Sequence, residues 1–138
     1  MRSITVADCM TRRVVSLAPD MEVVEAIRIL LKHKVTAAPV LDSEHKLVGI
    51  LSESDCLSAT LTSSYYSQDF GLVSEYMTAS VMSAGEEDSV LDVYERFMKQ
   101  RAVRVPVLDD CDRLVGILSP KDLMRAVLEY YERPAGAK

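Results

Sequence analysis

The sequence predicts a mixed α/β (α+β) fold, in which two β-α-β-β-α repeats pack sheet to sheet about a pseudo-two-fold axis. The first observation is an internal repeat: a shift of 67 positions aligns residues 6–57 with 73–124 with 18 identities in 52 positions. Unrelated segments of average composition would match at roughly one position in sixteen. The second observation is that both halves carry the same order of strand and helix patterns. A unit of roughly 50 residues buries too little surface to be stable alone, so we expect the repeats to share one core.

Each repeat begins with a short strand that is followed by a helix. The β-branched run Val14–Leu17 predicts the first strand, and Pro19-Asp20 marks the start of the helix behind it. Apolar side chains at helical spacing predict amphipathic helices over residues 21–33 and 88–100. These side chains are Val23, Ile27, Leu30 and Leu31 in the first copy and Val90, Tyr94, Phe97 and Met98 in the second.

A hairpin and a second helix complete each repeat. Two apolar runs, 37–41 and 47–51, are joined by five polar residues and predict a hairpin of two largely buried strands. Pro39 and its counterpart Pro106 donate no ladder hydrogen bond, which places them at a strand start, an edge or a bulge. Ser52 and Ser119 open the second helix, and Pro134 ends its second copy.

These patterns divide the chain into repeat 1 (1–62), a linker (63–72), repeat 2 (73–132) and a flexible tail (133–138). The linker is rich in Ser, Thr and Tyr, and the tail contains Pro, Ala and Gly, which is typical of a frayed terminus. No further domain accompanies the pair in this sequence, so we expect a stand-alone module.

The composition disfavours several classes of protein. Sixteen basic against 21 acidic residues give a net charge of -5, which disfavours binding to a nucleic acid polymer. No run of 18 apolar residues is present to span a membrane, and residues 1–13 lack the apolar stretch of a signal peptide. Three widely spaced cysteines and two isolated histidines are typical of a reduced, cytoplasmic protein without a metal centre.

The sequence also lacks the motifs of common enzymes. Its five glycines never cluster, so the P-loop and the GxGxxG fingerprint are absent, as are GxSxG, HExxH and CxxC. No pair of a nucleophile and a base is visible in the sequence. We therefore expect a protein that is not an enzyme.

The two helix starts, Ser52-Glu53-Ser54-Asp55 and Ser119-Pro120-Lys121-Asp122, carry the most suggestive polar residues. Ser-x-x-Asp is a capping-box pattern, and proline suits the first helical position, so capping alone explains both motifs. The same geometry offers free amides and a partial positive charge to a phosphate, and a carboxylate that can accept two ribose hydroxyls. The two interpretations are compatible.

The repeated motifs resemble those of the CBS domain family, which is named for cystathionine β-synthase. Each copy has Met-Thr near its start, Pro-Val-Leu-Asp in its middle and Gly-Ile-Leu-Ser-x-x-Asp at its end. Two units in tandem are similar to a Bateman module, and the resemblance covers about residues 3–130. It implies a regulatory module that binds AMP, ADP, ATP, NAD or S-adenosylmethionine in clefts between the repeats. It also implies a homodimer that signals to an effector protein, which the sequence leaves unidentified.

The resemblance also implies which residues contact the ligand. Ribose is expected on Asp55 and Asp122, with phosphate near Ser52, Ser54 and Ser119. The base is expected between the first strand and the proline segment of the hairpin. The residues concerned are Val14, Val15, Ser16, Thr36, Ala37, Ala38 and Pro39 in the first copy, and Val81, Met82, Ser83, Val103, Arg104, Val105 and Pro106 in the second.

The two copies differ in charge near the expected phosphate. Lys121 and Arg104 of the second copy correspond to Ser54 and Ala37 of the first. We therefore expect a polyphosphate to prefer the second cleft. The resemblance implies that the helices at 21–33 and 88–100 form the dimer face, although their apolar side chains could equally be buried inside the monomer. The alternative function is a structural or interaction module of the same fold, which dimerises and binds a partner protein while its clefts stay empty.

Overall fold

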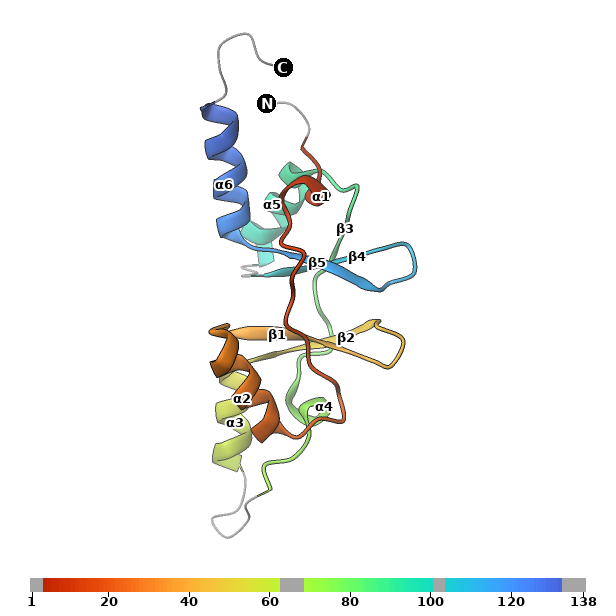
Figure 1. The fold of residues 1–138 in the computed structure, drawn as a ribbon, viewed down its shortest axis with the longest axis vertical. Helices are drawn as coiled ribbons and strands as arrows, with labels where there is room; N and C mark the ends of the chain where they lie inside the picture. Colours follow the sequence, from red (N-terminus) through yellow and green to blue (C-terminus); the bar gives the residue numbers. More distant parts are fainter. Residues whose placement is uncertain (1–3, 63–68, 101–103, 133–138) are drawn as a thin grey trace. The chain divides into compact units, whose positions relative to one another are not determined.

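The computed structural model describes residues 4–62, 69–100 and 104–132 (Figure 1). Val103, most of the linker and the tail lie outside these residues. In chain order the elements are α1 (Val6–Cys9), α2 (Val23–His33), β1 (Ala37–Leu41), β2 (Leu47–Ser52), α3 (Glu53–Thr62), α4 (Val73–Tyr76), β3 (Ala84–Gly85), α5 (Val90–Gln100), β4 (Val105–Leu108), β5 (Leu114–Leu118) and α6 (Pro120–Tyr131). The predicted mixed α/β fold of two β-α-β-β-α repeats is confirmed.

The first strand of each repeat is shorter than predicted. In the first half, only Leu17 pairs, and it forms a parallel bridge with Val40. In the second half, β3 is two residues long and begins directly after Ser83, where it pairs in parallel with β4. The segments Val14–Ser16 and Val81–Ser83 therefore precede the sheets. Of these described segments, only Leu17 and Ala84–Gly85 have a partner strand alongside, so the residues before them form no ladder.

The two amphipathic helices begin two residues later than predicted, at Val23 and Val90. Glu22 keeps an extended backbone (φ -71°, ψ 144°) as the residue before α2, which delays the first turn. At the other end of α2, Lys34 adopts a left-handed conformation with φ 56°. Its amide bonds back to the carbonyl groups of Leu30 and Leu31, and the helix ends there.

The predicted hairpin is present as the antiparallel pair β1 and β2. Asp42 shapes its loop, because Oδ1 accepts hydrogen bonds from the amides of Glu44 at 2.8 Å and Lys46 at 3.0 Å. His45 has φ 68° in this loop, and Asp112 has φ 63° at the matching position of the second hairpin. The two copies thus repeat the same turn with different residues.

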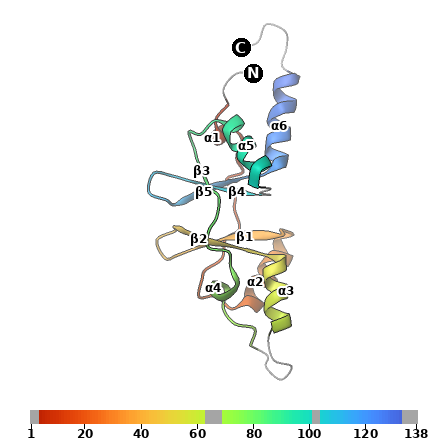
Figure 2. The ribbon, with the colours of Figure 1, turned by 180° about the vertical axis from the view of Figure 1, so that it is seen from behind.

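The compact units of the fold do not coincide with the two repeats of the sequence. One unit combines Met1–Arg13 with Met82–Asp110 and Val115–Lys138, and the other combines Val14–Val81 with Cys111–Leu114. The short helix α1 therefore lies with α5 and α6, and α4 lies with β2 and α3 (Figures 1 and 2). The opening segment of each repeat therefore belongs to the unit that contains the hairpin of the other repeat.

Backbone pairing fixes both exchanged segments. Thr11 exchanges two hydrogen bonds of 2.9 Å with Ile117 at the edge of β5, and Thr78 does the same with Ile50 at the edge of β2. The Met-Thr motif of one repeat is therefore a partner of the Gly-Ile-Leu motif of the other. This pairing gives the two repeated motifs a structural reason to occur together.

The buried residues form two clusters instead of the single shared core that we expected. One cluster includes Val6 and Met10 together with residues of α5, β4, β5 and α6. The other includes Val73 together with residues of α2, β1, β2 and α3. The interdependence of the repeats comes from the exchanged segments, because each cluster is completed by a side chain from the opposite repeat. Among the described residues, no helix has the length and apolar character needed to cross a bilayer.

Candidate functional site

In the first half, the structure brings the expected base and phosphate segments together at one end of the hairpin. Ala37, the first residue of β1, lies opposite Ser52, the last residue of β2. The amide of Glu53 donates to the carbonyl of Thr36 at 2.9 Å, which ties the start of α3 to the residue before β1. Ser16 directly precedes Leu17, which bridges to β1. The predicted residues are thus neighbours in space as well as in motif.

Pro39 lies inside β1, and its setting explains why a proline is accepted there. The carbonyl of Pro39 accepts a hydrogen bond from the amide of Leu17 at 2.9 Å. The nitrogen and carbonyl of one strand residue point to the same edge, so the nitrogen of Pro39 points away from β2. Pro39 therefore removes no hydrogen bond from the pairing of β1 with β2, because its nitrogen lies on the other edge of β1. The backbone groups of Ala37, two residues earlier, point to that same edge.

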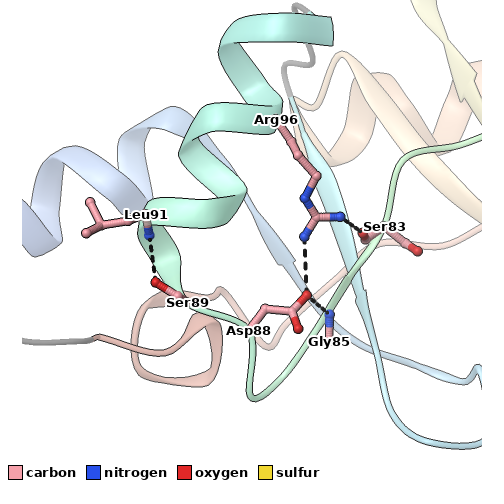
Figure 3. Close-up of polar contacts among 6 residues, drawn as sticks. All are labelled: Ser83, Gly85, Asp88, Ser89, Leu91 and Arg96. Carbon is pink, nitrogen blue, oxygen red and sulfur yellow. Dashed lines mark hydrogen bonds and ion pairs between the residues drawn. The ribbon is translucent and has the colours of Figure 1, made fainter.

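In the second half, Arg96 of α5 holds the segment that precedes β3 (Figure 3). Its guanidinium donates to the carbonyl of Ser83 at 2.9 Å and to Asp88 Oδ2 at 3.2 Å. The same carboxylate oxygen accepts the amide of Gly85 at 2.8 Å. Met21 and Ile29 occupy the positions of Asp88 and Arg96 in the first repeat, so this polar network belongs to the second half alone.

Both Ser-x-x-Asp motifs form the predicted capping contacts. Asp55 Oδ2 accepts hydrogen bonds from the amide of Ser52 at 2.8 Å and from its hydroxyl at 3.0 Å. Asp122 Oδ2 accepts the corresponding pair from Ser119 at 2.9 and 3.1 Å. Each helix start is therefore held by reciprocal bonds between the serine and the aspartate.

The two aspartates differ beyond this shared cap. Asp122 is 2% exposed, and its Oδ1 accepts hydrogen bonds of 3.0 Å from the Thr11 hydroxyl and from the Arg125 guanidinium. Asp55 is only partly buried. None of the described residues donates to Asp55 Oδ1. The first copy thus presents an available carboxylate oxygen, whereas the second copy does not.

The remaining predicted residues are distributed unevenly. Lys121 and Ser54 are exposed in the first turns of α6 and α3, and Arg104 is half-buried before β4. Ala38 and Pro39 are buried in β1, as are Val105 and Pro106 in β4. The strand residues are therefore buried inside the fold, and the exposed residues at the helix starts are accessible to solvent.

Sequence reasoning did not single out Thr11, Arg125 or Arg96 as members of the site. Thr11 carried a signal, because the Met-Thr motif is repeated, but its contact with Asp122 spans 111 positions of the chain. Arg125 also carried a signal in the sequence. It stands three residues after Asp122 on a helix, a spacing at which side chains meet, and the first repeat has Ser58 at the matching position.

A cavity of about 290 Å³ lies beside Asp122 and is lined by Ile4 and by residues of α1 and α6. Asp8, Asp122 and Glu129 give it three carboxylates, against the single guanidinium of Arg125. Cys9 also lines the cavity, and burial raises the pKa of its thiol, with Asp8, Asp122 and Glu129 adding to the effect. Among the described residues, no group of three or more His, Cys, Asp and Glu side chains is arranged to hold a metal ion.

The predicted amphipathic helices divide their apolar residues between the core and solvent. Val90 and Phe97 of α5 are buried, whereas Tyr94 is 48% exposed and Met98 is 66% exposed. A groove of about 810 Å³ runs between α5 and α6. Its lining includes Leu91, Tyr94, Met124, Val127, Leu128 and Tyr131. The side chains that line this groove are almost all apolar.

Comparisons with known proteins agree with this architecture. CBSX2, a CBS-pair protein from Arabidopsis thaliana whose structure has been solved in complex with AMP, is 30% identical and superposes with a TM-score of 0.83 over 93% of this chain and 98% of its own. The CBS domain pair of protein MJ0100, solved with 5'-methylthioadenosine and S-adenosyl-L-methionine, is 29% identical, with a TM-score of 0.78 over 94% of this chain and 99% of its own.

Curated enzymes match over part of their length only. The L-aspartate semialdehyde sulfurtransferase of Methanocaldococcus jannaschii is 32% identical over 120 residues, which are 87% of this chain and 22% of the enzyme. This chain spans about a fifth of the length of the curated enzymes it matches. The CBS domain signature itself matches twice, over residues 6–62 and 73–129. With its two repeats, their exchanged segments and these matches, the chain belongs to the CBS domain family and carries a pair of CBS domains.

Proposed function

We propose that this CBS pair is a regulatory module that binds an adenosine-containing ligand and passes the binding event to a partner protein. The observation that carries the proposal is the similarity, over 93% of the chain, to a CBS pair solved with AMP. AMP, ADP and ATP are the first candidates, and NAD and S-adenosylmethionine follow. All of these ligands share the adenine and ribose that the repeated motifs would recognise.

The polar groups at the two helix starts support this proposal. A carboxylate at the start of a helix accepts hydrogen bonds from ribose hydroxyls, and the free amides of the first turn attract a phosphate. Ser52 and Asp55 stand at one such start, and Ser119 and Asp122 stand at the other. The segments before and within β1, Val14–Ser16 and Thr36–Pro39, supply small side chains and backbone groups for the base. Val81–Ser83 and Arg104–Pro106 are the counterparts in the second half.

The ligand would act by shifting a conformational equilibrium. A ligand changes a population only to the extent that it binds one state more tightly than the other. The exchanged segments offer such a coupling, because Thr78 belongs to the second repeat in sequence and exchanges two backbone hydrogen bonds with Ile50 of β2, the strand that leads into the helix start at Asp55. A change at this helix start would therefore reach the opening segment of the second repeat.

Isothermal titration calorimetry of the intact protein with AMP, ADP, ATP, NAD and S-adenosylmethionine tests the proposal. Micromolar binding of at least one ligand is the expected result, with weaker binding in Asp55→Ala or Asp122→Ala. Guanosine monophosphate serves as the matched control ligand, since it keeps the ribose and phosphate and changes the base. Absence of heat with every ligand, from a protein shown to be folded, would favour the alternative of an interaction module with empty clefts.

We also propose that the protein forms a homodimer through α5 and α6. Contiguous exposed apolar surface on a small protein usually marks an interaction site. Met124 is 64% exposed, Val127 is 56% exposed and Tyr131 is 83% exposed along the groove between these helices. A second copy of the chain is the natural occupant, because each copy presents the same groove and two such faces form a self-complementary contact.

Sedimentation velocity tests this assembly. Val127→Glu places a charge in the groove and is expected to convert a dimer into a monomer. Lys99→Glu changes charge on an exposed position of α5 outside the groove and is the matched control, with the dimer retained. A wild-type protein that sediments as a monomer at 100 µM, roughly a hundred times a micromolar Kd, would contradict the proposal.

A further inference from the structure

The carboxylate of Asp122 has no acceptor position left for a ligand. Oδ2 accepts two hydrogen bonds from Ser119, and Oδ1 accepts one from Thr11 and one from Arg125. An ionised carboxylate offers about four lone-pair positions to donors. Four protein donors therefore satisfy Asp122, which is only 2% exposed.

Arg125 is the contact whose residue type differs between the two halves, because Thr11 corresponds to Thr78 whereas Arg125 corresponds to Ser58. Its NH1 lies 3.0 Å from Asp122 Oδ1 as an ion pair one helical turn along α6. A charge-assisted hydrogen bond of this kind is stronger than one from a neutral hydroxyl, so a ribose hydroxyl competes poorly for the same oxygen. The neighbouring carboxylates Asp8 and Glu129, which line the adjoining cavity, also favour a cation at this place.

The first half has the same motif without this obstruction. Asp55 keeps the cap from Ser52 on Oδ2, and Oδ1 receives no hydrogen bond from the residues that the structure describes. Ser58 stands where Arg125 stands in the second repeat, and it is short and uncharged. A ribose diol can therefore donate to Asp55 without displacing a protein group.

We propose that the adenosine ligand binds in the first half, at Asp55, and that Arg125 acts as an internal competitor that keeps the second half closed. This inference rests on the function proposed above and assigns its site. It reverses the order expected from the positive charges of the second copy. Lys121 is exposed, and solvent weakens its attraction for a phosphate. Arg125 is itself 60% exposed, but the carboxylate that it contacts is only 2% exposed, so the contact on Asp122 is less open to solvent.

Arg125 and Ser58 stand at matching positions, and exchanging the residue types of these two positions tests this assignment. Calorimetric titration of each variant with AMP is the measurement. Wild type is expected to bind one AMP per chain, and Asp55→Asn is expected to weaken that binding at least tenfold. Arg125→Ser, which installs the residue of the first repeat, is expected to open a second site. Ser58→Arg, which installs the residue of the second repeat, is expected to weaken binding at least tenfold. Arg28→Ser, the same substitution at an exposed ion pair on α2, is the control and leaves one site of unchanged affinity.

The possible outcomes separate this inference from the proposed function. Loss of binding in Asp122→Asn with wild-type affinity in Asp55→Asn would overturn the assignment while keeping the proposed function. Binding of AMP by Arg125→Ser but not by wild type would also overturn the assignment to Asp55. If neither wild type nor Arg125→Ser binds AMP or any other adenosine ligand, the proposed function itself fails. Circular dichroism and urea midpoints of each variant establish that the proteins compared are folded.

Discussion

Met10 lies against Gly116 so closely that a Cβ on the glycine would stand 2.6 Å from the Met10 sulfur and 3.0 Å from the carbonyl oxygen of Thr11. The second copy repeats the relationship, because a Cβ on Gly49 would stand 2.8 Å from the sulfur of Met77. A glycine in each hairpin therefore leaves room for the opening segment of the other repeat to lie on the sheet. The backbone bonds of Thr11 and Thr78 depend on this approach.

Replacing Gly116 with alanine is expected to destabilise the protein by about 1–3 kcal/mol, because overpacking forces the Met10 segment off β5. The free energy of unfolding, measured by urea denaturation, checks this expectation. Gly85→Ala is the matched control. Its nearest neighbour would lie at 3.4 Å and belongs to the side chain of Asp88, so a small change is expected. Equal stability of Gly116→Ala and wild type would contradict the proposed close approach.

Removing the Arg96 side chain is expected to cost about 1 kcal/mol in stability, which is the typical net value of a lost intramolecular hydrogen bond. Arg96 links α5 to the carbonyl of Ser83 and to Asp88 (Figure 3). Arg28→Ala is the control, because Arg28 pairs with Glu25 on the exposed face of α2. That pair is expected to contribute about 0.5 kcal/mol or less. Thermal and urea unfolding of both variants should rank them in this order.

Truncation of the two aspartates should have unequal effects on stability. Asp55→Ala removes a helix cap and is expected to cost about 1 kcal/mol. Asp122→Ala removes the same cap and also the acceptor of the Thr11 hydroxyl, so about 2 kcal/mol is expected. Urea titrations of both variants at neutral pH provide the comparison. A loss in Asp55→Ala as large as that in Asp122→Ala would argue against the closed state of Asp122.

The three cysteines are expected to react at different rates with a thiol reagent. Burial raises the pKa of the Cys56 thiol, and the charges of Asp55 and Glu53 raise it further. Burial together with nearby carboxylates also raises the pKa of the Cys9 thiol. Cys111 is exposed and should react first. Reaction with 5,5'-dithiobis(2-nitrobenzoate) at pH 7, 8 and 9 measures these rates. Cys111→Ser should remove the fast phase, and a fast phase that persists would contradict the assignment.

The raised thiol pKa values also predict the direction of a stability change with pH. Between the ordinary pKa of a thiol and its raised value, the unfolded chain loses a proton that the folded protein keeps. Stability attributable to Cys9 and Cys56 is therefore complete below the ordinary thiol pKa and falls as the pH rises through the raised values. Urea midpoints of wild type and Cys9→Ala at pH 7 and pH 10 should show a smaller alkaline decrease in the variant.

Local patterns in the sequence were sufficient to predict most of the elements. The hairpin follows from two apolar runs joined by a polar loop, and the capping role of Ser52 and Ser119 follows from a spacing of three residues to an aspartate. Such features depend on neighbours within one or two turns of the chain. The internal repeat also predicted the overall organisation of the chain, because matching motifs in both halves indicated two copies of one unit.

Contacts between distant residues could not be obtained in this way. The exchange of α1 and α4 between the two units, and the two cores that result, depend on Met10 meeting Gly116 and Thr11 meeting Ile117. The short first strand also differs from the prediction, since β-branched residues at Val14 and Val15 favour a strand only where a partner lies alongside.

The sequence by itself determined the family, the repeated motifs and the two helix starts, because each is a pattern of residue types at short spacing. The sequence shows Arg125 where the first repeat has Ser58, but the tertiary structure decided which carboxylate is available. Asp55 and Asp122 are the same residue in the same motif, and only the packing of Thr11 and Arg125 around Asp122 makes them different. The physical reason is that hydrogen-bonding capacity is a property of the assembled surroundings, whereas a motif specifies only the groups that could take part.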